Sequence, residues 1–143
     1  MLRLLLVLLV GCGGGATYQV KLVNRTDHAL EAVYIYPTGT TARGTSRAKL
    51  APNAETVLAI AAGHLDVFAV MEKIKVDQFR SDTRTASGTI ELRGPAVVIF
   101  HEDTARPAEL SQPGTFGVPF RKAPPPPGQP DAAQPEAPQP EAP

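Results

Sequence analysis

Side chains that could perform chemistry are few in this chain and lie far apart in the sequence. Histidine occurs three times, and no pair of histidines has the spacing of a helical or hairpin metal site. The densest group of possible metal ligands or acid–base residues is His101, Glu102 and Asp103. It directly follows the apolar run 96–100, and binding residues often lie where a buried strand ends. These three residues are the candidate ligand or metal site, and a solvated strand exit is the alternative interpretation.

No motif for enzymatic catalysis accompanies this group. The serines lack the glycine-flanked turn of a hydrolase nucleophile, and no glycine-rich loop has the pattern that cradles a phosphate. The chain has no tryptophan that would suggest a sugar platform. Other aromatic residues could form a binding face or pack in the core, namely Tyr18, Tyr34, Tyr36, Phe116 and Phe120. We therefore expect a protein that is not an enzyme and binds no cofactor.

The only cysteine, Cys12, stands at the end of an N-terminal segment that is typical of export signals. Arg3 precedes an apolar run, residues 4–10, that is too short to span a bilayer as a helix. Gly11 and Cys12 then supply the small residues expected at a cleavage site. We interpret residues 1–11 as a signal peptide, and with one cysteine we expect no intramolecular disulfide.

The sequence Leu9-Val10-Gly11-Cys12 resembles the lipobox of bacterial lipoproteins. The resemblance implies that the Cys12 thiol receives a diacylglycerol, that cleavage falls between Gly11 and Cys12, and that the new amino terminus is acylated. The acyl chains of the diacylglycerol and of the acylated amino terminus together exceed what stable membrane anchoring requires. In many enteric-type bacteria, an aspartate directly after the lipidated cysteine resembles an inner-membrane retention signal, and here that position is Gly13. We therefore expect a cell-envelope protein anchored in the outer membrane, facing the periplasm or the cell surface. The alternative is an ordinary secretory signal with an incidental cysteine.

Segments of unusual composition flank the part of the chain that can form a core. Residues 12–16 comprise the lipidated Cys12 and a short, flexible glycine tether. From Arg121 onward the composition shifts to proline, alanine, glutamine and glutamate. We expect residues 121–143 to be a disordered, proline-rich tail with polyproline-II character. Such a tail is a spacer, a ligand for a groove that binds extended proline-rich peptides, or a solubilising segment.

Residues 17–120 have the size of one domain with one core. The whole chain carries 14 Lys and Arg against 14 Asp and Glu, so its formal net charge is zero. The closest basic cluster, formed by Arg43, Arg47 and Lys49, has no interleaved aromatic residue that bases could stack on. A general attraction for anionic partners is thereby excluded, and we expect no nucleic-acid binding.

Alternating and β-branched runs predict strands throughout this domain. The expected strands are residues 18–22, 30–36, 56–61, 65–71, 74–76, 89–92 and 96–100. We expect one hairpin through residues 24–27 and another through residues 62–64, where Gly63 would supply a positive φ. The prediction is an all-β fold, a single antiparallel β-sandwich of about seven strands. A helix within residues 55–79 is the alternative, because residues there also recur at steps of three and four.

Residues 50–70 resemble a pattern common in immunoglobulin-like and transthyretin-like extracytoplasmic modules. The residues that carry the resemblance are the turns Pro52-Asn53 and Ala62-Gly63 and the strand residues Asp66-Val67. Asn53 stands where glycine is usual, and Leu65 stands where an aromatic residue is usual. The resemblance implies a β-sandwich and implies no activity.

Two functions are compatible with these features. The favoured one is an accessory or scaffold subunit of a cell-envelope assembly, held by its lipid anchor and bound to an envelope protein through an exposed sheet edge or the tail. The second is a periplasmic small-molecule or metal-binding module that uses loop 38–47 and the His101 group. A concave site lined by both would discriminate the second function from the first.

Overall fold

The computed structural model describes residues 15–121. The predicted signal peptide, Gly11, Cys12 and nearly all of the proline-rich tail lie outside these residues. The described residues form β-strands and one 3-10 turn, and none of their helical structure is long and apolar enough to cross a bilayer. The expectation of an all-β fold is confirmed, and residues 55–79 form strands and turns.

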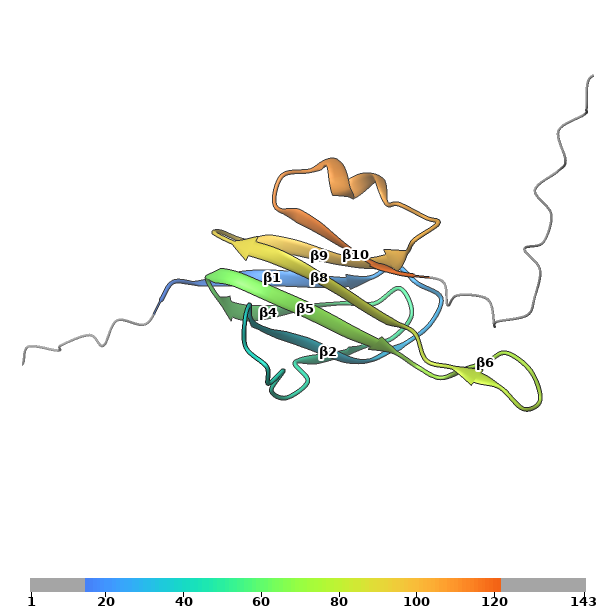
Figure 1. Cartoon of the computed structure of the whole chain (residues 1–143). Helices are drawn as coiled ribbons and strands as arrows, with labels where there is room; N and C mark the ends of the chain where they lie inside the picture. Colours follow the sequence, from blue (N-terminus) through green and yellow to red (C-terminus); the bar gives the residue numbers. More distant parts are fainter. Residues whose placement is uncertain (1–14, 122–143) are drawn as a thin grey trace, which may run out of the picture.

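Eight strands assemble into two four-stranded sheets (Figure 1). The first sheet has the order β10-β9-β1-β4 and contains β1 (Thr17–Asn24), β4 (Glu55–Ala61), β9 (Ala96–Glu102) and β10 (Thr115–Phe120). The second has the order β3-β2-β5-β8 and contains β2 (Leu30–Pro37), β3 (Ala48–Leu50), β5 (Gly63–Met71) and β8 (Thr85–Leu92). The short strands β6 (Ile74–Lys75) and β7 (Ser81–Asp82) pair with each other, and the 3-10 turn η1 (Ala108–Ser111) lies between β9 and β10.

Both sheets contribute to one hydrophobic core. Alternate side chains of β5 are buried, because successive residues of a strand point to opposite faces. The rings of Phe100 and Phe120 are fully buried, with their centroids 6.5 Å apart. Phe116 and Tyr18 are partly buried against the same core. Phe120 is therefore a core residue and is not available for an aromatic binding face.

The connections between strands differ from the sequence expectation. Strands β1 and β2 lie in different sheets, and so do β4 and β5, so both predicted hairpins are wrong. Gly63 does adopt a positive φ of 139°, but the turn there passes the chain from one sheet to the other. Alternation along a strand marks the residues that face the core, and it does not encode which strand is the neighbour.

The first sheet is mixed, which corrects the prediction of an antiparallel fold. Strand β9 pairs in parallel with both β1 and β10, whereas β1 pairs antiparallel with β4. Residues 103–114 return the chain to the starting end of β9, as a parallel pairing requires (Figure 1). Strand β10 was not predicted, because Gly117 and Pro119 interrupt its apolar pattern. Pro119 is tolerated since β10 is an edge strand, which needs ladder N–H groups on one side only.

The directions of the strands define two opposite ends of the domain (Figure 1). Strand β1 begins at Thr17, opposite Ala61, and ends at Asn24. Strand β10 ends at Phe120, opposite Glu102 at the far end of β9. We call the Thr17 side the entry end and the side with Asn24 and Phe120 the distal end. A strand of 8 residues places the two ends about 26 Å apart.

Candidate functional site

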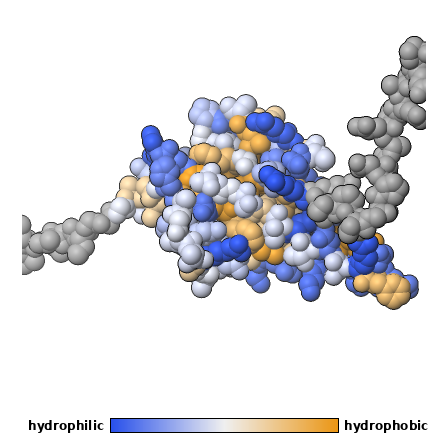
Figure 2. All heavy atoms as spheres, viewed as in Figure 1, coloured by the Kyte–Doolittle hydropathy of each residue, from blue (hydrophilic) through white to orange (hydrophobic). Residues whose placement is uncertain are grey.

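A hairpin formed by β6 and β7 projects from the distal end (Figure 1). We call this hairpin, residues 73–83, the arm. Phe79 at its tip is 93% exposed, and Val76 is 62% exposed. Figure 2 shows this apolar tip standing clear of the domain beside hydrophilic residues. Aromatic side chains supply much of the energy of protein interfaces, which makes the arm a candidate binding element.

Hydrogen bonds give the tip of the arm a defined conformation. The Val76 N–H donates to the Arg80 carbonyl at 3.0 Å, and the Phe79 N–H donates to the Asp77 carboxylate at 2.8 Å. The second bond is a local turn contact that aspartate favours. A backbone ordered in advance loses less conformational entropy when Phe79 enters a binding pocket.

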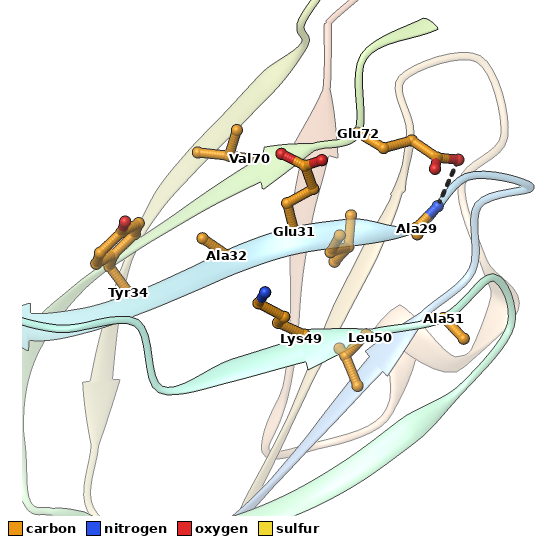
Figure 3. Close-up of a pocket in the computed structure, with 10 residues that line it drawn as sticks. Ala29, Glu31, Ala32, Tyr34, Lys49, Leu50, Ala51, Val70 and Glu72 are labelled. Carbon is orange, nitrogen blue, oxygen red and sulfur yellow. Dashed lines mark hydrogen bonds between the residues drawn. The ribbon is translucent and has the colours of Figure 1, made fainter.

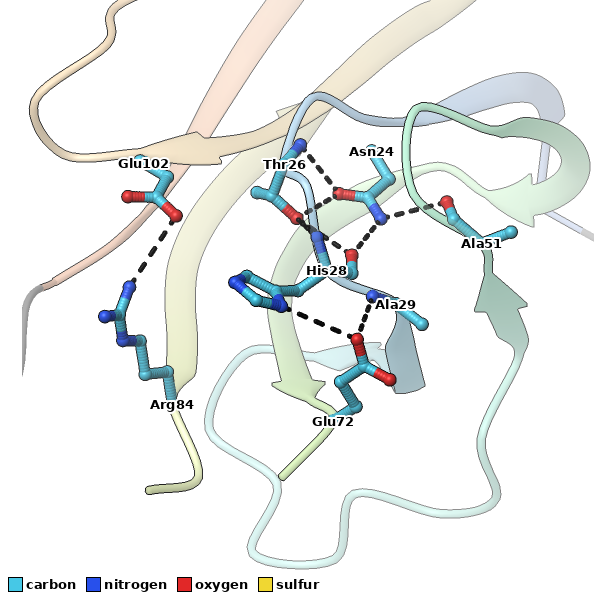
Figure 4. Close-up of polar contacts among 8 residues, drawn as sticks. All are labelled: Asn24, Thr26, His28, Ala29, Ala51, Glu72, Arg84 and Glu102. Atoms are coloured by element: carbon cyan, nitrogen blue, oxygen red, sulfur yellow. Dashed lines mark hydrogen bonds and ion pairs between the residues drawn. The ribbon is translucent and has the colours of Figure 1, made fainter. Parts of the chain in front are cut away.

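Charged residues tie both legs of the arm to the domain (Figure 4). On the leg that leaves β5, the Glu72 carboxylate accepts the Ala29 N–H at 3.1 Å and lies 3.6 Å from the His28 imidazole. On the leg that leads to β8, the Arg84 guanidinium lies 3.6 Å from the Glu102 carboxylate. Since Glu102 belongs to the first sheet and Ala29 adjoins the second, the arm is tied to both sheets.

A buried polar network shapes the β1–β2 turn, whose Ala29 N–H binds Glu72 at the root of the arm (Figure 4). The Asn24 side chain is fully buried, and its amide donates to the carbonyls of His28 at 2.8 Å and Ala51 at 3.0 Å. Its oxygen accepts the Thr26 N–H at 3.0 Å and the Thr26 hydroxyl at 2.8 Å. These bonds join the β1–β2 turn to the β3–β4 turn, and they satisfy buried polar atoms that would otherwise destabilise the fold.

A hollow of about 640 Å³ lies beside the root of the arm (Figure 3). Leu30 pairs with Met71 and Ala32 pairs with Val70, so Glu31 is an extra residue in β2. Such a bulge bends the strand and redirects its side chains. We call the hollow the bulge pocket. Its accessible apolar surface comes from Ala32, Tyr34 and Val70, since Leu30 and Leu50 are buried in the core. The charged residues of its lining are Glu31, Lys49 and Glu72.

The structure separates the three residues of the predicted His101 site. His101 and Asp103 line a groove of about 510 Å³, which Glu102 does not line. His101 is buried, and its Nδ1 lies 2.8 Å from the Glu102 backbone carbonyl. The Glu102 carboxylate faces Arg84 instead, because successive strand residues point to opposite faces. Within residues 15–121 no group of three or more His, Cys, Asp and Glu side chains could hold a metal ion.

Loop 38–47 does not join the His101 groove. It lies at the entry end, where the Thr38 N–H donates to the His64 carbonyl at 3.0 Å. From this loop Arg43 reaches over the Phe68 ring, 3.7 Å from its centroid, on the outer face of the second sheet. The His101 groove is instead lined by residues of β8, β9 and β10 and of the β9–β10 connection. The two parts of the pocket predicted for a binding module are therefore not brought together.

Sequence reasoning overlooked the arm and the bulge pocket. Residues 74–76 alternate like a strand of the domain, but β6 contains only Ile74 and Lys75 and pairs outside both sheets. The signal that could have revealed the arm is Phe79, a single aromatic residue in the polar stretch 77–82. No such signal marks Glu31, because a bulge becomes visible only when the partner strand is known.

No protein-family model, curated protein or solved structure matches this chain. A functional assignment therefore rests on the N-terminal sequence pattern and on the geometry of the distal end.

Proposed function

We propose that this chain is a membrane-anchored extracytoplasmic lipoprotein that acts as an accessory or scaffold subunit of a bacterial cell-envelope assembly. The observation that carries the proposal is the lipobox-like sequence ending at Cys12, in front of a domain that the chain enters at the end opposite the arm. A lipid on Cys12 would hold the entry end close to the membrane. The arm and the end of β10 would then face away from it, toward envelope proteins.

The construction of the distal end supports a role in protein–protein contacts. The arm presents Phe79 on a backbone held by hydrogen bonds, and its legs are tied to both sheets by Glu72 and Arg84. Strand β10 is a sheet edge, and the proline-rich segment follows it in sequence. Projecting aromatic anchors, sheet edges and proline-rich segments are common means of binding proteins. A β-sandwich of the immunoglobulin-like class would suit this role.

The lipid anchor is tested by Cys12→Ser. We expect the parent chain to remain in the membrane fraction after a high-salt wash, because acyl chains hold it independently of charge. The variant should move to the soluble fraction, whereas the control variant Gly14→Ser, in the tether, should fractionate like the parent chain. Continued membrane association of Cys12→Ser at high salt would refute the anchor.

The scaffold role is tested by affinity capture from mildly cross-linked membranes. The full chain is compared with a form that ends at Lys122. A stoichiometric envelope protein captured with the full chain would support the proposal, and its loss on truncation would assign docking to residues 123–143. Recovery of the chain alone would overturn the scaffold role.

A further inference from the structure

The arm tip and the bulge pocket are complementary in charge and polarity. The tip is apolar at Phe79 and Val76, and its charged residues are Lys75, Asp77 and Arg80. The pocket has both apolar and polar surface, and its charged lining residues are Glu31, Lys49 and Glu72. Of these six charged side chains, only Glu72 takes part in an ion pair among residues 15–121, with His28. The other five therefore remain available to a partner.

The arm does not fill the pocket of its own molecule. Phe79 is 93% exposed, and the arm points away from the sheets (Figure 1). The root of the arm nevertheless adjoins the pocket, since Glu72 both lines the pocket and directly precedes the arm. When a projection and a matching pocket lie at the same end of a molecule, two copies related by a twofold axis can satisfy each other reciprocally.

We propose that two copies of this chain form a dimer by exchanging their arms. Phe79 of each copy occupies the bulge pocket of the other. Arg80 then pairs with Glu31, and Asp77 pairs with Lys49, across the two contacts. The proposal does not depend on the lipid anchor, because every residue that it uses lies within the described domain.

The charges of the arm favour a second copy of the chain, rather than a lipid surface, as its binding partner. Within residues 73–83 the arm carries Lys73, Lys75 and Arg80 against Asp77 and Asp82. An anionic membrane attracts clusters of cations, and this nearly balanced set would gain little from it. The bulge pocket, in contrast, offers a partner of the correct sign to Arg80 and to Asp77. Each contact relies on one aromatic anchor and two exposed ion pairs, so we expect dissociation in the micromolar range.

Disulfide trapping tests the position of the arm. The chain has a single cysteine, Cys12, so the parent chain serves as the blank. Two differently tagged full chains are produced together, one with Gln78→Cys beside Phe79 and one with Ala51→Cys in the pocket lining. Mild oxidation should give a mixed disulfide between them. The matched control replaces Ala51→Cys by Val57→Cys, a position on β4 that is 53% exposed and outside the pocket.

Sedimentation of the full chain in mild detergent tests the contribution of Phe79 and of the charges. Phe79→Ser should raise the dimer dissociation constant at least tenfold, and Val57→Ser should leave it unchanged. Thermal unfolding should confirm that Phe79→Ser is folded, since the lost side chain is exposed. Glu31→Arg should weaken the dimer, and adding Arg80→Glu to the same chain should restore it.

Two results would overturn arm exchange. One is a chain that stays monomeric at all concentrations, with mixed disulfide no more abundant than in the Val57→Cys control. The other is a monomer that binds vesicles of anionic phospholipid through Phe79, which would assign the arm to a lipid surface.

Discussion

The guanidinium of Arg84 and the carboxylate of Glu102 lie 3.6 Å apart and join the two sheets at the root of the arm (Figure 4). Arg84 also lies 3.8 Å from Asp82 in the arm, and its buried Nε has no hydrogen-bond partner among the described residues. Both side chains of the 3.6 Å pair remain partly exposed, at 23% and 38%. Ion pairs with this much exposure contribute little stability. We infer that this pair instead restricts the leg of the arm that leads to β8.

Arg84→Met should change the free energy of unfolding by less than about 1 kcal/mol, because it keeps the aliphatic stem and removes an unpaired buried donor. Hydrogen exchange in residues 74–82 should become faster, because one leg of the arm loses its tie. Denaturant unfolding and exchange mass spectrometry measure the two effects. Arg93→Met removes the entry-end pair with Glu91 and should leave the exchange of the arm unchanged. Unaltered exchange in Arg84→Met would show that the pair does not position the arm.

Asn24→Ala should destabilise the domain by about 1–3 kcal/mol, because it leaves the Thr26 N–H without its acceptor and removes the amide donor to the carbonyls of His28 and Ala51. Denaturant unfolding measures the loss. Gln19→Ala, an exposed substitution on the same strand, should stay within about 0.5 kcal/mol of the parent chain. Equal effects of the two substitutions would contradict the role assigned to the buried network.

Gly117→Ala should destabilise the β9–β10 connection by about 1 kcal/mol. The new Cβ would lie 2.8 Å from a Leu110 methyl carbon, which can rotate aside, and 3.0 Å from the ring of buried His101, which has less freedom to move. Gly88→Ala is the control, because its Cβ would meet Val118 at an ordinary 3.4 Å. Limited proteolysis should cut residues 103–114 faster in Gly117→Ala only. Similar cutting in both variants would rule out this steric explanation.

Asn53→Ala should cost about 1 kcal/mol, because Asn53 has a φ of 56°, a region that asparagine tolerates better than alanine. Asn53→Gly should be close to neutral, since glycine adopts this φ without strain. Thermal and denaturant unfolding of the two variants check the difference. A stability loss in Asn53→Gly that equals the loss in Asn53→Ala would assign the effect to the asparagine side chain instead.

Much of the strand content could be predicted from the sequence. The predicted runs 18–22, 30–36, 56–61, 65–71 and 96–100 each fall within two residues of the observed limits of β1, β2, β4, β5 and β9. Each run was recognised because alternation and β-branched content are local properties of a strand. The short strand β3, the interrupted strand β10 and the boundaries of the arm were missed because their sequences lack that pattern.

For the candidate sites, too, some features follow from the local sequence and others depend on the tertiary structure. The anchor motif at Cys12 is contiguous in sequence and lies outside the described residues, so it stays a prediction. His101, Glu102 and Asp103 are also contiguous, but alternation along β9 sends Glu102 toward Arg84 and away from the groove that the other two line. Adjacent residues of a strand cannot converge on one ligand without a bend or a bulge.

The sequence by itself determined the all-β character of residues 15–121 and the alternation that buries one face of each strand. Only the tertiary structure decided that β9 runs parallel to both neighbours, that the predicted hairpin strands lie in opposite sheets, and that Glu31 stands beside the root of the arm. The physical reason is the distance along the sequence between the residues that determine each feature. Alternation follows from the backbone geometry of a few neighbouring residues, whereas strand pairing and the placement of Glu31 beside the arm depend on many weak contacts between distant segments.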